Sequence, residues 1–115
     1  MAAFRILLII LFLELAIYTV FTVSAHGLNF YPDYFGDMLA MGWPGQFNLD
    51  FTCLLVLGAL WIAWREGFAL SGLAIAVAIF FGGALVLTAY LLIASFRAKG
   101  DPAALLLGAT RAAAR

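Results

Sequence analysis

Charge is scarce in this 115-residue chain, which holds six basic and six acidic side chains and has a formal net charge of zero. Charged residues make up 10% of the sequence, whereas an average soluble domain carries about 25%. No basic block is present, so we expect no nucleic-acid partner. The scarcity of charge predicts a chain that lies in apolar surroundings.

Cysteine and histidine are equally rare. Cys53 is the single cysteine, which excludes an intramolecular disulfide, and His26 is the single histidine. No segment has the ligand spacing of a compact metal motif, and no segment carries a catalytic signature. We therefore expect no catalytic residue, metal or cofactor, and an enzyme is the less favoured class.

What the chain does have is three long apolar runs, at residues 4–25, 47–64 and 68–96. They hold 22, 18 and 29 residues, and a helix needs about 20 residues to cross a hydrocarbon core. The sequence predicts one all-α domain over residues 1–115, a multi-pass integral membrane bundle of three helices. These helices are expected at about 3–24, 47–66 and 68–96.

The connector after the first run cannot be one regular element, because residues 25–46 contain four glycines and two prolines. Pro32 suits the first position of a short helix reaching Met41, and the aromatic residues there suit the headgroup layer. We therefore expect a short interfacial helix in this connector. In the tail, residues 97–115, Asp101 and Pro102 predict the start of a short surface helix.

Three spans would place the termini on opposite sides of the membrane. Arg5 and Arg65 would then lie on one side, and the four basic residues of the tail on the other, which favours a cytoplasmic C-terminus. The connector falls on the side of the tail yet has no lysine or arginine, as is common in exported loops. A cleaved signal peptide is the alternative for the first run, although its length and Glu14 argue against it.

Glu14 is the sharpest chemical feature, because it lies near the middle of the first helix, where a charge is most costly. Tyr18 and Thr22 follow at four-residue spacing and form one polar stripe with it. Two interpretations stay open. The stripe is a proton or ligand site, or Glu14 is a protonated carboxyl that hydrogen-bonds between helices.

A second polar group belongs to the connector side, where its members can reach one interface. Histidine and carboxylates can ligate a metal, but such residues more often cap helices or contact lipid headgroups. We expect Asn48 to cap the second helix, and the string from Gly42 to Phe51 to form a structural clasp or, as the alternative, the rim of a pocket. The group comprises His26, Asp33, Asp37, Gln46, Asn48 and Asp50.

Small residues recur at four-residue spacing in the third run, at Ala74, Ala78 and Gly82. Small side chains let membrane helices approach closely, so this stripe predicts helix packing. The partner is either the first helix or another chain. Gly82 with Gly83 is also a candidate flexing point.

Two resemblances bear on function. The stretch from Leu13-Glu14-Leu15 through Ser24, with Gly27 and Pro32, is loosely similar to small multidrug resistance transporters, which use a membrane-embedded Glu in their first helix. The four spans and the Trp-Ser-Gly motif of that family are missing. A second pattern resembles a family of small bacterial three-span membrane proteins known only as a domain of unknown function. The residues that carry it are Asn48 and Asp50, Trp61 to Glu66, Gly83, Ala89 to Leu92, and Arg97.

The favoured function is a non-enzymatic accessory, assembly or structural component of a bacterial inner (plasma) membrane. Its expected partners are the lipid bilayer and either another membrane protein or further copies of this chain. The alternative is a small proton-coupled transporter or carrier that uses Glu14. A membrane enzyme or metal protein built on the connector-side polar group is the third interpretation.

Overall fold

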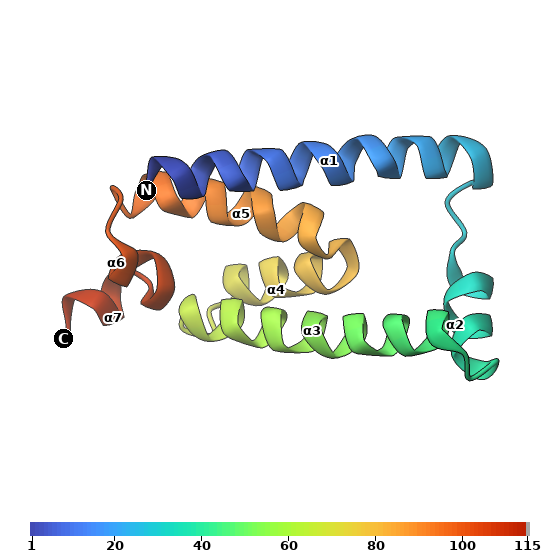
Figure 1. Cartoon of the computed structure of the whole chain (residues 1–115). Helices are drawn as coiled ribbons and strands as arrows, with labels where there is room; N and C mark the ends of the chain where they lie inside the picture. The colour runs from blue at the N-terminus through green and yellow to red at the C-terminus, as the bar shows by residue number, and fades with distance from the viewer. Residues whose placement is uncertain (115) are drawn as a thin grey trace.

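The computed structural model describes residues 1–114, which form seven α-helices joined by short turns (Figure 1). No strand occurs among these residues, so the predicted all-α class is confirmed. The helices are α1 (Ala2–His26), α2 (Tyr31–Leu39), α3 (Trp43–Arg65), α4 (Leu70–Gly82), α5 (Ala84–Arg97), α6 (Pro102–Leu107) and α7 (Ala109–Ala113).

Two helices are long and apolar enough to cross a membrane: α1 with 25 residues and α3 with 23. Almost none of the apolar stretch of either helix is buried by the rest of the described chain. α4 and α5 are apolar but have only 13 and 14 residues. The structure thus has two candidate membrane-spanning helices, and the predicted bundle of three spanning helices is not confirmed.

The predicted single helix over residues 68–96 is wrong, because the chain turns at Gly83 and forms a V-shaped hairpin of α4 and α5. Gly83 has φ 62° and ψ −143°, a combination that is nearly restricted to glycine. Each arm of the hairpin is roughly 20 Å long. The uniform hydrophobicity of the run concealed this turn.

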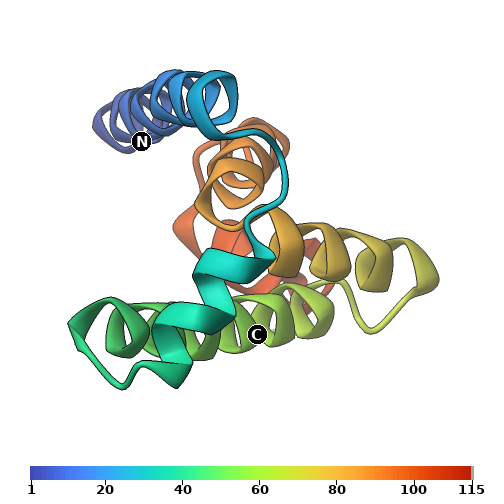
Figure 2. The same cartoon turned by 90° about the vertical axis from the view of Figure 1, so that its right-hand side faces the viewer.

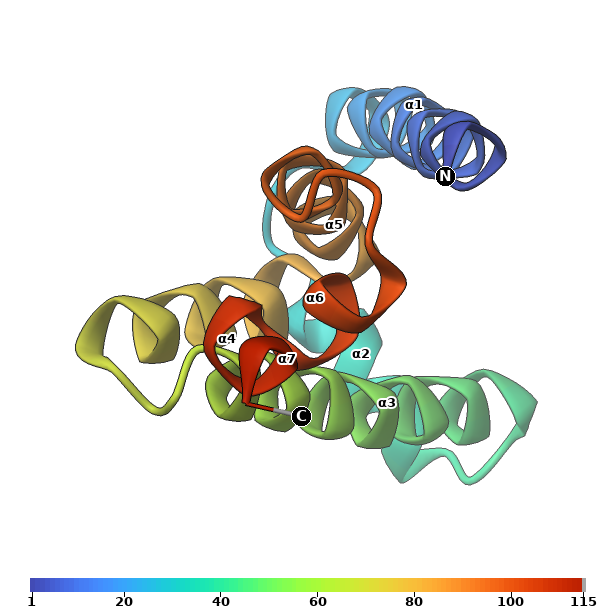
Figure 3. The same ribbon diagram turned by 90° about the vertical axis from the view of Figure 1, so that its left-hand side faces the viewer.

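α5 lies between α1 and the pair formed by α3 and α4, as the two end views show (Figures 2 and 3). α1 therefore packs on α5, while α3 packs on α4 and, at its beginning, on α2. Few large side chains are fully buried, among them Ile62 of α3 and Ile79 of α4. The hairpin is thus the element that joins the two long helices.

Both termini lie at the same end of the molecule (Figure 1). A Cβ atom placed on Gly100 would lie 3.7 Å from the Cβ of Met1, and the Arg5 Nε donates to Ser95 Oγ at 3.0 Å. Because the hairpin returns towards the end at which it started, the structure does not confirm the expected separation of the termini by three crossings.

The ends of the shorter elements follow local rules in most places. The predicted connector helix is present as α2, with Pro32 in its first turn. Asp101 caps α6, since its Oδ1 accepts a hydrogen bond from the Ala103 amide at 3.1 Å, as expected. The single short helix expected in the tail is divided in two, because Gly108 separates α6 from α7. α3, however, begins at Trp43 rather than near Asn48, because Pro44 already suits its first turn.

Candidate functional site

The polar stripe of α1 faces away from the rest of the chain. Glu14, Tyr18 and Thr22 are all exposed and line one shallow surface hollow of about 690 Å³ together with His26. The Thr22 hydroxyl donates to the Tyr18 carbonyl at 2.9 Å, so it is satisfied within α1. Among the described residues no hydrogen bond to the Glu14 side chain is present. A hydrogen bond between helices at Glu14 would therefore need another chain.

The connector-side polar group is dispersed over three helices. His26 belongs with the stripe of α1, Asp33 and Asp37 lie on α2, and Asp50 lies on α3. No set of three metal-ligating side chains comes together within the described part of the chain. Exposed Gln46 lines a separate small surface hollow with Trp43.

Asn48 of α3 holds α2 against α3 by a hydrogen bond, as expected for a structural clasp. Its Nδ2 donates to the Tyr34 carbonyl at 3.1 Å, and the Tyr34 hydroxyl is hydrogen-bonded to the Thr52 hydroxyl. Gly45 lies at the same crossing, where an added Cβ would approach the Asp37 carbonyl oxygen to 2.2 Å. The distinctive string at the start of α3 thus lets α2 lie directly on α3.

An aromatic cavity of about 570 Å³ lies beside this clasp, between α2, α3 and the tip of the hairpin. Asn48 and Thr52 line it as well, so the string is also the rim of a pocket. Sequence reasoning missed this cavity, because its lining comes from α2, α3 and α4, and the way in which these helices pack on one another is not encoded in local sequence. Its aromatic lining consists of Phe30, Tyr31, Tyr34, Phe35, Phe51, Phe80 and Phe81.

Small residues of α4 fall on two faces. Ala74 and Ala78 are exposed, whereas Gly72, Ala76 and Ile79 are buried. A Cβ on Gly82 would lie 2.2 Å from a methyl carbon of Val86, so Gly82 serves the hairpin turn. Packing of Ala74 and Ala78 against another chain stays a prediction.

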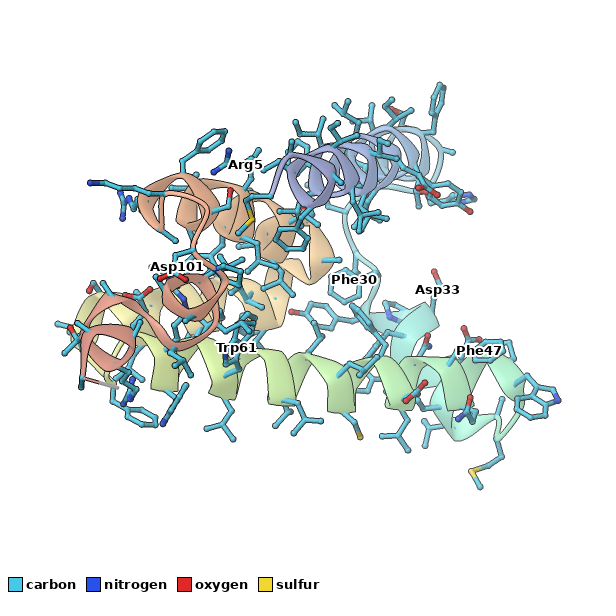
Figure 4. The ribbon with its side chains drawn as sticks, turned by 60° about the vertical axis from the view of Figure 1, so that its left-hand side comes forward. Arg5, Phe30, Asp33, Phe47, Trp61 and Asp101 are labelled. Atoms are coloured by element: carbon cyan, nitrogen blue, oxygen red, sulfur yellow. The ribbon has the colours of Figure 1, made fainter. Side chains whose placement is uncertain are left out.

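The end of the molecule that holds the termini is basic. Five basic side chains lie on the elements at this end, and Figure 4 shows Arg5 and Asp101 there, with Asp33 and Phe47 at the opposite end. The sixth basic residue, Arg115, lies outside the described residues. The five are Arg5, Arg65, Arg97, Lys99 and Arg111.

Arg65 is the centre of this basic end, and its side chain is only 10% exposed. It donates to the Leu105 carbonyl at 2.6 Å and to the Tyr90 hydroxyl at 2.7 Å. It also forms an ion pair with Glu66 at 2.8 Å, and Tyr90 donates to the same Glu66 carboxylate. The network ties the end of α3 to α5 and α6.

Sequence reasoning placed Arg65 and Arg97 on opposite sides and so missed the network. The adjacent pair Arg65-Glu66 directly after Trp64 was the available signal, since an acid beside a base at a helix end suggests an internal ion pair. Its third member, Tyr90, is separated from Glu66 by the whole of α4. That contact follows only once the chain is known to turn at Gly83.

Two hollows meet at the basic end. The first, of about 580 Å³, lies between the ends of α3 and α5 and the tail, and is lined by Arg65, Arg97 and Arg111. The second, of about 520 Å³, runs between α4 and α5. Both are lined by Arg65, Glu66 and Arg97, so a charged cavity borders an apolar groove.

Comparison with protein families, with curated proteins and with solved structures gave no match to this chain. The resemblance to small bacterial three-span membrane proteins therefore stays a prediction.

Proposed function

We propose that the chain is an integral membrane protein in which α1 and α3 cross the bilayer, while the α4–α5 hairpin enters and leaves on one side. The exposed apolar surfaces of α1 and α3 support this arrangement, because contiguous apolar surface of this extent marks contact with lipid or protein. Backbone that breaks a helix at membrane depth is tolerated where protein covers it. Gly83 meets this condition, since it is buried beside Phe51 of α3.

The basic end is proposed to face the cytoplasm. Segments next to a span that carry lysine and arginine are retained on the cytoplasmic side, and the five described basic residues share one end. The opposite end carries Asp33, Asp37 and Asp50. Both termini are then cytoplasmic, which replaces the orientation that three spans favoured.

Within this membrane we propose an accessory or assembly role, in which α1 packs against another membrane protein. Glu14 carries the proposal, because its carboxyl lies near the middle of α1 on a face that no other helix of the described chain covers. An ionised side chain at the bilayer centre costs about 2.5 kcal/mol or more, and intramembrane acids usually face protein or water. A partner that offers a hydrogen-bond donor would relieve this cost.

Photo-cross-linking in intact membranes tests the role of this face. A photoreactive residue is placed at Ile17, one helical turn after Glu14. The control is the same photoreactive residue at Leu54 on α3, because Ile17 and Leu54 are similarly exposed, at 57% and 61%. We expect Ile17 to give one protein adduct of fixed mass and Leu54 to give lipid adducts. An adduct of twice the chain mass would identify a second copy as the partner.

Variants of Glu14 complete that test. The adduct should disappear in Glu14→Leu and persist in Glu14→Gln, since glutamine can still hydrogen-bond at nearly the same place. Lipid adducts alone from Ile17, or an adduct indifferent to Glu14→Leu, would contradict the accessory role.

A small proton-coupled transporter or carrier is the second candidate, and one observation favours it. The hollow that Glu14 lines extends along α1 to His26 at the helix end, so polar groups lead from mid-helix to the surface. Infrared titration of the carboxyl stretch tests this role. Reversible ionisation near neutral pH, abolished by Glu14→Gln, supports transport, whereas a carboxyl that stays protonated throughout contradicts it.

Kinship with the small bacterial membrane proteins that the sequence resembles, and residence in a bacterial inner membrane, are also part of the proposal, with two crossings in this chain in place of the three expected for that family. The sequence pattern that carries the resemblance supports it, and two of its residues, Asn48 and Arg65, make contacts between helices.

A further inference from the structure

We propose that the basic end binds one anionic phospholipid, with its phosphate in the cavity lined by Arg97 and Arg111 and one acyl chain in the groove between α4 and α5. The proposal rests on the membrane placement given above. It goes beyond that placement by naming a ligand, a site and the residues that select it.

The cavity has an excess of positive charge and donors that the fold leaves open. Three arginines and one glutamate line it, and Glu66 is already paired with Arg65. Arg97 is exposed, and no hydrogen bond within the described residues engages its guanidinium. The arginine fork matches phosphate oxygens, so Arg97 is suited to hold the phosphate.

Arg111 adds a second, oriented cation on the other wall. Its Cζ lies 4.2 Å from the ring centroid of Trp64, and its Nη1 donates to the Trp64 carbonyl. Stacking of this kind fixes the plane of the guanidinium and leaves its remaining N–H groups free to donate. The cavity therefore offers an exposed arginine, Arg97, and a held arginine, Arg111, to a single anion.

The groove gives the ligand an apolar part. It runs between the hairpin arms, which are roughly 20 Å long, and shares Arg65, Glu66 and Arg97 with the cavity. Beyond these residues its walls are mostly apolar. They consist of Ser71, Ile75, Ala78, Val86, Ala89, Tyr90, Ile93 and Ala94.

The depth of the site also fits a lipid. Trp64 stacks on Arg111 of the cavity wall, and Trp61 Nε1 donates to the Leu106 carbonyl of α6 at 3.0 Å. Tryptophan is enriched at the headgroup layer. Basic pockets between membrane helices on the cytoplasmic side are known to bind anionic headgroups. A phosphate held by Arg97 thus lies at the level where lipid phosphates reside.

Native mass spectrometry of the whole protein in detergent measures this binding. The protein is titrated with phosphatidylglycerol, with phosphatidylcholine of the same acyl chains, and with soluble glycerol phosphate. We expect phosphatidylglycerol to bind most tightly. Arg97→Gln should weaken its binding on the order of tenfold, as expected for loss of a hydrogen bond to a charged group, and Arg111→Gln should do likewise.

Two matched controls separate the site from general charge and general packing. Lys99→Gln removes the same charge at the same end but lies outside both hollows, so it should leave binding unchanged. Ala78→Leu fills the groove, whereas Ala74→Leu enlarges another exposed alanine of α4 outside it. Only Ala78→Leu should weaken lipid binding, and neither should alter binding of glycerol phosphate.

Each other result overturns the proposal. Equal binding of the two lipids, or equal effects of Arg97→Gln and Lys99→Gln, would show that the cavity selects no anion. Glycerol phosphate binding as tightly as the lipid, with no effect of Ala78→Leu, would make this a site for a free phosphate ester. The membrane placement is tested by reporter fusions at the two termini, and the accessory role by the cross-links at Ile17. Neither experiment depends on the cavity, so failure of those proposals is distinguished from failure of lipid binding.

Discussion

Arg65 shows how one side chain can hold three elements of a small protein together. It belongs to α3, yet its donors reach carbonyl oxygens of α6 and the hydroxyl of Tyr90 in α5. Because the side chain is only 10% exposed, its charge depends on these acceptors and on Glu66 for compensation. Removal of the guanidinium would leave several of them without a donor.

We therefore expect Arg65→Met to lower the stability of the protein by about 2–4 kcal/mol, the range for breaking a largely buried charged network. Arg65→Lys should recover only part of this loss, because an ammonium lacks the planar fork. The thermal unfolding midpoint in one detergent measures the effect. Arg97→Met is the control and should change it little, and equal losses in both variants would contradict a special role for Arg65.

At the scale of the element, the hairpin of α4 and α5 is defined by one residue. The conformation of Gly83 costs other residues about 1–3 kcal/mol. A Cβ at this position would also lie 3.1 Å from the ring of Phe51 in α3. The turn is thus fixed both by the backbone and by the helix against which it packs.

Gly83→Ala should accordingly destabilise the protein by about 1–3 kcal/mol, measured by the same thermal unfolding. Gly58→Ala, inside α3 where a Cβ meets nothing within 4 Å, should be neutral or stabilising by up to about 1 kcal/mol. If residues 68–96 formed one continuous helix, Gly83→Ala would stabilise as well. The sign of its effect therefore decides between hairpin and helix.

The sequence predicted helix ends well where neighbouring residues determine them, and predicted turns and contacts poorly where residues distant in the sequence determine them. Pro32 and Asp101 marked helix starts correctly, and the length of the first run identified α1. The stripe from Glu14 to Thr22 also lies on one face, as helical spacing requires. The turn at Gly83 was noted only as a flexing point, since glycine permits such a turn without requiring it, and the basic end could not be assembled without it.

At the scale of the whole molecule, the hairpin sets the number of crossings in the proposed membrane placement, and hence the side on which the C-terminus lies. Two crossings return the chain to the side on which it began, whereas three would not. The five described basic residues then share one side, as the positive-inside rule requires of the proposed two-crossing topology.

Reporter fusions at residue 1 and at residue 115 should both report the cytoplasm. Basic charge at the other end should favour the opposite orientation. The double replacement Asp33→Lys with Asp37→Lys is therefore expected to give a mixture of molecules in the two orientations. Single replacements of Arg97 and Lys99 by Gln serve as controls and should leave both reporters cytoplasmic. Fusions that report opposite sides would restore the three-span arrangement.

The contact between α1 and α5 has a consequence for the time course of synthesis. Arg5 and its acceptor Ser95 are 90 positions apart, and chains grow at roughly 5–20 residues per second. α1 therefore waits on the order of 5–20 s before its intramolecular partner has been made. During that interval a helix with a carboxyl on one face and an unfilled packing surface on the other stands alone. The face of α1 that packs on α5 is therefore accessible to other proteins until α5 has been synthesised.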